Sequence, residues 1–224
     1  MRPELLDRLA GEASVAPLRM RQARAAGLLG ASALIALLLT LLWLGARSDI
    51  VQAAQVPVFW LKLGFPAALC MLAGLALNCS LHPGAPLKGP VSGLVSLVLV
   101  LWLLAWWVSR DAGEAERSAS FWGTTWLECP AYIAAVTTPT LAAALYWARG
   151  FGPLSPRLTG ALAGLASGAF GAALYALHCR ESGIPFLATW YLVGAAIPAG
   201  VGLALGPRVL AWPHKIEAHR LGVH

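Results

Sequence analysis

The chain has 224 residues, of which 58% are apolar and only 12% are charged. A soluble domain of this length needs more polar surface to cover its core, so the composition excludes an ordinary soluble protein. The 16 Lys and Arg residues exceed the 10 Asp and Glu residues, which gives a formal net charge of +6. The basic residues are concentrated in alternate loops, so this charge reflects membrane orientation and gives no reason to expect nucleic-acid binding.

Segment 1–26 precedes the first long apolar run, and Leu5, Leu6 and Leu9 fall on one face of it at helical spacing. A helix of this kind docks its leucine face in the groove of a partner, or lies on the inner leaflet with help from the neighbouring arginines. No clean cleavage site follows the first apolar run, so we expect this run to be retained as a helix.

Six stretches of about 20 mostly apolar residues follow, each long enough to cross a hydrocarbon core of ~30 Å. They are 27–45, 57–81, 89–109, 129–147, 158–178 and 185–206. Backbone polar groups must pair within the chain in lipid, so each stretch should be a helix. We therefore predict an all-α membrane protein: a bundle of six transmembrane helices over 27–206, with a tail, 207–224.

The basic residues divide unequally between alternate loops. One set of loops and ends holds eleven and the other set four: Arg2, Arg8, Arg19, Arg21, Arg24, Lys88, Arg149, Arg157, Arg208, Lys215 and Arg220, against Arg47, Arg110, Arg117 and Arg180. The positive-inside rule then places both termini in the cytoplasm. Lys62 falls within the second span, and we expect its ammonium to snorkel to the outer interface; the alternative is a functional charge inside the membrane.

Two of the four cysteines should meet at the outer side. Cys129 opens the fourth span in WLECPAYI, and Cys179 closes the fifth in YALHC, while Cys70 and Cys79 fall within the second span. A short loop joins the fourth and fifth spans, so they should pack antiparallel and bring Cys129 and Cys179 to one depth.

Three interpretations of this cysteine pair are open. Cys129, Cys179 and His178 could bind a soft or borderline metal ion, with Glu128 or Glu181 nearby. The two thiols could instead form a disulfide in an oxidising compartment. Finally, the two cysteines could have no chemical role. The fifth span also carries Gly160, Gly164 and Gly168 at four-residue spacing, which allows close helix packing within or between chains.

Four segments carry a resemblance to a known family: FWLKL (59–63), WLECPAYI (126–133), YALHC (175–179) and GPRVLAW (206–212). With the six-span layout and a short cytoplasmic head, the chain resembles the NrsF family of bacterial membrane-bound anti-sigma factors. Members hold an extracytoplasmic-function sigma factor at the inner membrane. The resemblance implies that the N-terminal segment engages the sigma factor and that Cys129 and Cys179 sense metal stress.

The predicted function is therefore that of a non-enzymatic anti-sigma factor of the bacterial inner membrane. It requires no cofactor, a heavy-metal ion or oxidant is its signal, and a sigma factor is its partner. Leu5, Leu6 and Leu9 as sigma contacts, and His178 as a ligand, rest on spacing and proximity. The alternatives are a membrane thiol oxidoreductase, which usually needs a second exchanging cysteine pair, and a small metal transporter, which usually needs polar residues at mid-bilayer depth.

Overall fold

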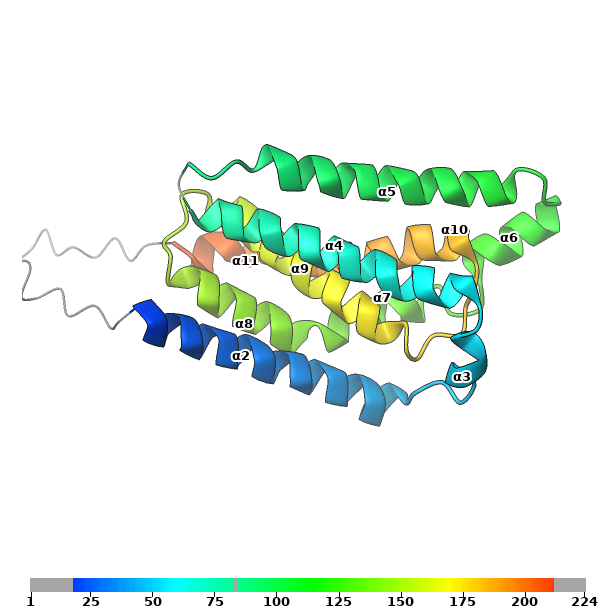
Figure 1. Cartoon of the computed structure of the whole chain (residues 1–224), viewed down its shortest axis with the longest axis horizontal. Helices are drawn as coiled ribbons and strands as arrows, with labels where there is room; N and C mark the ends of the chain where they lie inside the picture. Colours follow the sequence, from blue (N-terminus) through cyan, green and yellow to red (C-terminus); the bar gives the residue numbers. More distant parts are fainter. Residues whose placement is uncertain (1–17, 83, 212–224) are drawn as a thin grey trace, which may run out of the picture.

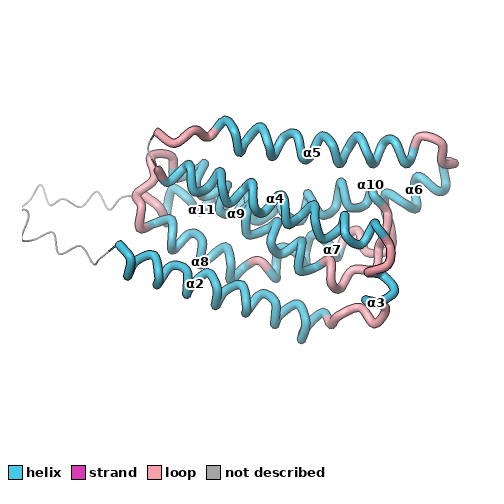
Figure 2. The backbone as a smooth tube through the Cα atoms, in the orientation of Figure 1, coloured by secondary structure: helices cyan, strands magenta, loops and turns pink. Residues whose placement is uncertain are grey.

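The structure is a computed structural model that describes residues 18–82 and 84–211. Leu5, Leu6 and Leu9 lie outside the described residues, so their predicted role is not addressed by the fold. The described part consists of helices and loops without a strand (Figure 2), which confirms the all-α class.

The helices follow one another along the chain with short connections (Figure 1). They are α2 (Leu18–Leu39), the π-helical turn η1 (Thr40–Leu44), α3 (Ile50–Ala53), α4 (Pro57–Leu81), α5 (Lys88–Ser109), α6 (Glu114–Trp122), α7 (Glu128–Val136), α8 (Thr138–Arg149), α9 (Pro156–Tyr175), α10 (Ile184–Phe186), the π-helical turn η2 (Leu187–Tyr191) and α11 (Leu192–Val209).

Five helices in the described part are long and apolar enough to cross a membrane, and a sixth is counted if α7 and α8 form one bent span. These two helices meet at an angle of 45°. The break falls at Thr137, and Pro139 lies in the first turn of α8, where its missing N–H and its ring are tolerated. The fourth apolar stretch is therefore a broken helix, whereas Pro66 and Pro198 lie inside continuous helices.

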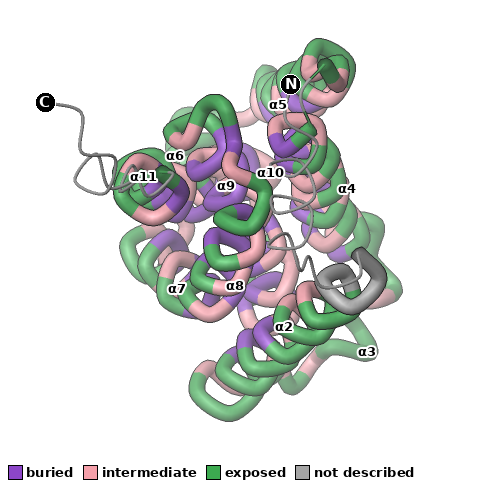
Figure 3. Tube along the Cα trace, turned by 90° about the vertical axis from the view of Figure 1, so that its left-hand side faces the viewer, coloured by how far each residue is buried: buried purple, intermediate pink, exposed green. Residues whose placement is uncertain are grey.

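Burial differs strongly between the helices. In the most apolar stretch of α9, 61% of the residues are buried, against 17% in the corresponding stretches of α2 and α5. Viewed along the bundle, α9 lies among the other helices, while α2 and α5 lie at its margins (Figure 3). The long fifth apolar stretch thus forms the centre of the fold.

The centre is held by a close contact between α9 and α11. A Cβ atom added at Gly168 would lie 2.6 Å from the backbone oxygen of Ala195, and one at Gly160 or Gly164 would meet the α11 backbone as well. Only glycine allows this approach, because any side chain would push the two backbones apart. The close packing predicted from the glycine spacing is confirmed as a contact within the chain.

One end of the bundle, here called the cysteine end, is formed by the loops 45–56, 110–127 and 176–183 (right in Figure 1). The helix α6 lies in the second of these loops. It was not predicted from the sequence, because it is short and charged. The start of α2 and the end of α11 lie at the opposite end (Figure 1).

Candidate sensor site at the cysteine end

The structure brings Cys129 and Cys179 together at the cysteine end. Cys129 lies in the first turn of α7, and Cys179 lies just beyond the C-terminus of α9. Their exposed fractions are 0% and 3%, both thiols are free, and both residues belong to the buried core. The two cysteines lie at the same end of the bundle, as the order of the spans predicts, while a shared sensing site stays a prediction.

Lys62 corrects one of our expectations. Its side chain is not solvent-exposed: it is 3% exposed, and its Nζ donates hydrogen bonds to the carbonyl oxygens of Cys179 (2.7 Å) and Glu181 (2.6 Å). The chain after α9 is not helical, so these carbonyls have no helical N–H partner. They accept hydrogen bonds from the buried ammonium and so offset the free-energy cost of removing this charge from water.

Residues 177–181, here called the hub segment, contact the loop after η1. The Arg47 backbone N–H donates to the Leu177 oxygen (3.1 Å), and His178 Nδ1 forms a hydrogen bond of 2.9 Å with the Gly45 oxygen. Arg180 Nη2 donates to a side chain in the same loop, Ser48 Oγ, at 3.1 Å. The residues around Cys179 are thus tied directly to the end of the first long helix.

The hub segment also contacts the chain that leads into α7. Both the backbone N–H and the hydroxyl of Thr124 donate to Glu181 Oε1, at 2.8 and 2.6 Å. The preceding residue, Gly123, has φ +57°, and a Cβ there would lie 2.9 Å from the Glu181 carboxyl carbon. Glycine therefore allows the chain to turn directly against the carboxylate, close to the start of the helix that carries Cys129.

The expected auxiliary ligands are not gathered around the two thiols. His178 is bonded to Gly45 and packs on the Tyr175 ring at 5.6 Å between centroids, and Glu181 is bonded to Thr124. Within 18–82 and 84–211, no group of three or more His, Cys, Asp or Glu side chains is placed to hold a metal ion. The described residues therefore offer a pair of thiols instead of the predicted three-ligand set.

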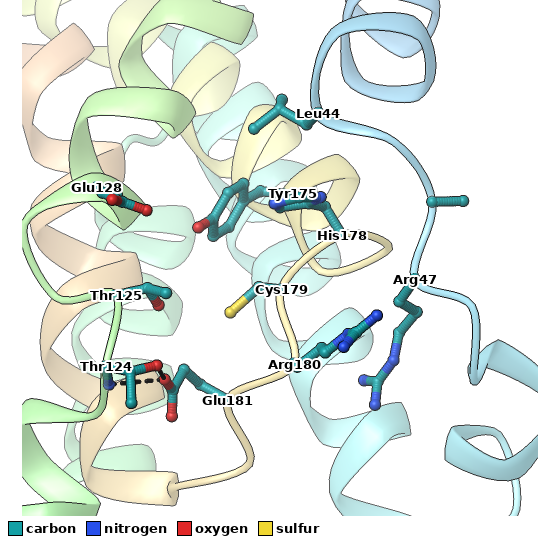
Figure 4. A pocket seen from close by; sticks show the side chains of 11 residues that line it. Leu44, Arg47, Thr124, Thr125, Glu128, Tyr175, His178, Cys179, Arg180 and Glu181 are labelled. Carbon is teal, nitrogen blue, oxygen red and sulfur yellow. Dashed lines mark hydrogen bonds between the residues drawn. The ribbon is translucent and has the colours of Figure 1, made fainter.

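A cavity of about 330 Å³ opens beside Cys179 (Figure 4). The Cys179 side chain points into it from the hub segment, and Thr125 and Glu128 line it from the α7 side (Figure 4). Two buried hydroxyls in the described structure lack a well-formed hydrogen bond, those of Thr125 and Tyr191. The Tyr191 ring lies 5.6 Å from Lys62 Nζ and Thr125 lines the cavity; unpaired buried polar atoms are rare in folded proteins and call for an explanation such as a functional role.

The rim of the cavity carries an ion pair. Arg47 Nη2 lies 2.7 Å from Asp49 Oδ2, and the hydrogen bonds from this guanidinium lower the pKa of the Asp49 carboxyl to about 2. Arg47 also donates its backbone N–H to the hub segment. The charged rim is therefore connected to the residues next to Cys179.

The described residues thus form an all-helical structure with five or six helices long and apolar enough to cross a membrane, and one of its ends buries two free thiols and a lysine. The family model NrsF, described as negative regulator of sigma F, matches residues 9–212. The chain belongs to the NrsF family.

Two curated relatives cover most of the chain. A protein named probable anti-sigma-F factor NrsF from Azospira oryzae is 38% identical over 209 residues, which are 93% of this chain and 98% of the relative. The anti-sigma-F factor NrsF of Caulobacter vibrioides is 34% identical over 212 residues, with the same coverage. Neither name is that of an oxidoreductase or a transporter. No solved structure matches the chain.

Lys62 and Tyr191 are among the residues of this site that were not predicted from the sequence. An isolated lysine in an apolar span was the available signal, since such a charge is costly unless the fold supplies partners. Nothing local in the sequence marks Tyr191, whose position beside Lys62 depends on how η2 packs against the hub segment.

Proposed function

We propose that this protein is an anti-sigma factor of the bacterial inner membrane. Its N-terminal segment holds a sigma factor of the extracytoplasmic-function class and releases it when Cys129 and Cys179 react with a metal ion or an oxidant. The observation that carries the sequestering role is the likeness, over 93% of the chain, to two proteins named anti-sigma-F factors. The sensing role is supported by the two free thiols at one buried site.

A single helix offers a structural connection between sigma-factor binding and cysteine sensing. The segment from Leu18 to Leu44 is helical throughout, first as α2 and then as η1. At about 1.5 Å per residue, such a helix extends roughly 40 Å. Its first residues belong to segment 1–26, the proposed sigma-binding segment, and the loop after it is bonded to the hub segment through Gly45 and Arg47.

Reaction at Cys179 acts on this connection through the hub segment. Bringing the two sulfurs onto one metal ion, or into one disulfide, moves Cys179 relative to Cys129, and the neighbouring contacts to the α2 side must then adjust. A nearly complete switch, from 1:99 to 99:1, requires that the signal favour one state by about 5.5 kcal/mol.

Co-purification tests the sequestering role. The full chain in detergent is compared with a variant lacking residues 2–17, which leaves α2 intact, and with a matched control lacking 212–224. We expect a co-expressed extracytoplasmic-function sigma factor to purify with the full chain and the control, and to be lost from the first variant. The proposal fails if the full chain retains none of the extracytoplasmic-function sigma factors with which it is co-expressed.

Cysteine variants test the sensing role. Replacing Cys129 and Cys179 by serine should abolish metal-induced release while the sigma factor remains bound. Serine at Cys70 and Cys79, the other two cysteines in the described structure, is the matched control and should respond as the unaltered chain does. Constitutive release from the first variant would contradict this mechanism.

A further inference from the structure

Lys62 is a buried cation without an acidic partner. Within the described part of the chain the ion pairs are Arg47–Asp49 and Arg110–Asp111, and Lys62 forms none. A charge held inside an apolar helix is costly and is retained where it does something that an apolar side chain cannot do. Its contacts show what that is.

The Lys62 ammonium holds the Cys179 residue in place from inside the bundle. Its bonds to the oxygens of Cys179 and Glu181 span Arg180, so two points of the hub segment are fixed to one atom of α4. The ring of Tyr191 covers the ammonium, with its centroid 5.6 Å from Nζ, at the distance of a cation–π contact.

The hydrogen bonds of the ammonium involve the backbone next to one of the two thiols. Lysine has three N–H donors, and two of them are used by the carbonyls. One of these carbonyls belongs to Cys179, which is 3% exposed. Lys62 thus contacts the backbone of a residue that carries one of the two buried thiols.

We propose that Lys62 is the positioning residue of the thiol pair: by holding the backbone of the hub segment, it keeps Cys179 buried at the end of the bundle where Cys129 lies. The proposal deepens the sensing role proposed above, because it assigns the residue that sets the geometry of the sensing pair. It assigns no part to Lys62 in sigma-factor binding.

Loss of Lys62 should then slow the bridging of the two thiols and speed the reaction of the single Cys179 thiol. With the hub segment released, the two sulfurs separate, so a short reagent that must join both reacts less. At the same time Cys179 is exposed more often, so a reagent that needs only one thiol reacts faster. A lysine that only fills space would be replaced by methionine, of similar length, without either change.

The experiment uses the full chain in detergent, with Cys70 and Cys79 replaced by alanine. Bridging is measured with dibromobimane, which becomes fluorescent when it joins two thiols, and single-thiol reaction with N-ethylmaleimide in a Cys129→Ser version, followed by mass. The variants are Lys62→Met, Lys62→Arg, which keeps a cation with several donors, and Lys88→Met as the matched control at the start of α5.

We expect Lys62→Met to lower bridging at least about fivefold and to speed N-ethylmaleimide reaction about tenfold, because loss of the charge-assisted hydrogen bonds makes local opening of the hub segment more frequent. Lys62→Arg should stay close to the unaltered chain, and Lys88→Met should match it. Equal bridging in Lys62→Met, or bridging and single-thiol reaction that rise or fall together, overturns the proposal. Should Lys62→Met not elute as the folded protein, Lys62→Gln, which retains N–H donors without the charge, takes its place under the same criteria. Neither assay involves a sigma factor, so the result is independent of the co-purification.

Discussion

Replacing Gly164 by alanine should force α9 and α11 apart. A Cβ at this position would lie 2.5 Å from the carbonyl carbon of Pro198 and 2.6 Å from the Cα of Ala199. Carbon atoms in ordinary contact lie ~3.5–4.0 Å apart, so the two backbones must separate by about 1 Å. No flexible side chain can yield instead, because the atoms that would be met belong to the backbone.

The expected cost follows from two opposing effects. Overpacking of a filled interior typically costs ~1–3 kcal/mol, whereas alanine is favoured over glycine in a helix by up to ~1 kcal/mol. Since the obstacle is rigid, we expect a net loss near 2 kcal/mol in the free energy of unfolding. This corresponds to a factor of about 30 in the folded-to-unfolded ratio.

The assay is unfolding of the purified protein in mixed micelles of increasing denaturing-detergent fraction, followed by circular dichroism. The matched control is Gly200→Ala on α11, where a Cβ would meet nothing within 4 Å. This control should unfold as the unaltered chain does or slightly later. If Gly164→Ala and Gly200→Ala unfold at the same detergent fraction, the argument from backbone contact is refuted.

Two further predictions concern the loops of the cysteine end. Glu181→Ala removes the acceptor of both Thr124 bonds, so hydrogen exchange at the Thr124 amide should become about tenfold faster; unchanged exchange would show that the bond does not hold the loop. The Asp49 carboxyl, with its pKa lowered to about 2 by Arg47, adds stability above its unfolded pKa of ~3.9 that is lost as the pH falls through about 2. A carboxyl titration by NMR should therefore give a midpoint near 2 that returns toward ~3.9 in Arg47→Gln, and equal midpoints in both proteins would contradict the pairing.

The apolar spans could be predicted from the sequence because their signal is local. The stretch 57–81 was expected as one helix and is α4 with the same bounds. The stretch 129–147 was expected as one span, and its division into α7 and α8 occurs at Thr137, two residues before Pro139. The helix α6 was missed because its nine residues include several charged ones and no apolar run.

The site was only partly predictable because its contacts are not local. The meeting of Cys129 and Cys179 followed from the order of the spans, which fixes the end of the bundle that each residue reaches. The contacts of Lys62 could not be inferred in this way, since its two acceptors lie 117 and 119 residues further along the chain. Whether a lysine in a span reaches the interface or a carbonyl inside depends on the loop that packs above it.

The unequal burial of the helices has a mechanical consequence. The helices α9 and α11 are in backbone contact through their glycines. We expect this pair to stay rigid, because sliding one helix along the other would bring backbone atoms into collision. The helix α2 is mostly exposed and is joined to the hub segment by the few bonds at Gly45, Arg47 and Ser48. In a bilayer its neighbours on the exposed side would be lipid chains, which offer little resistance to a shift along the helix axis. We therefore expect α2 to shift relative to the other helices of the bundle, while those helices keep their positions.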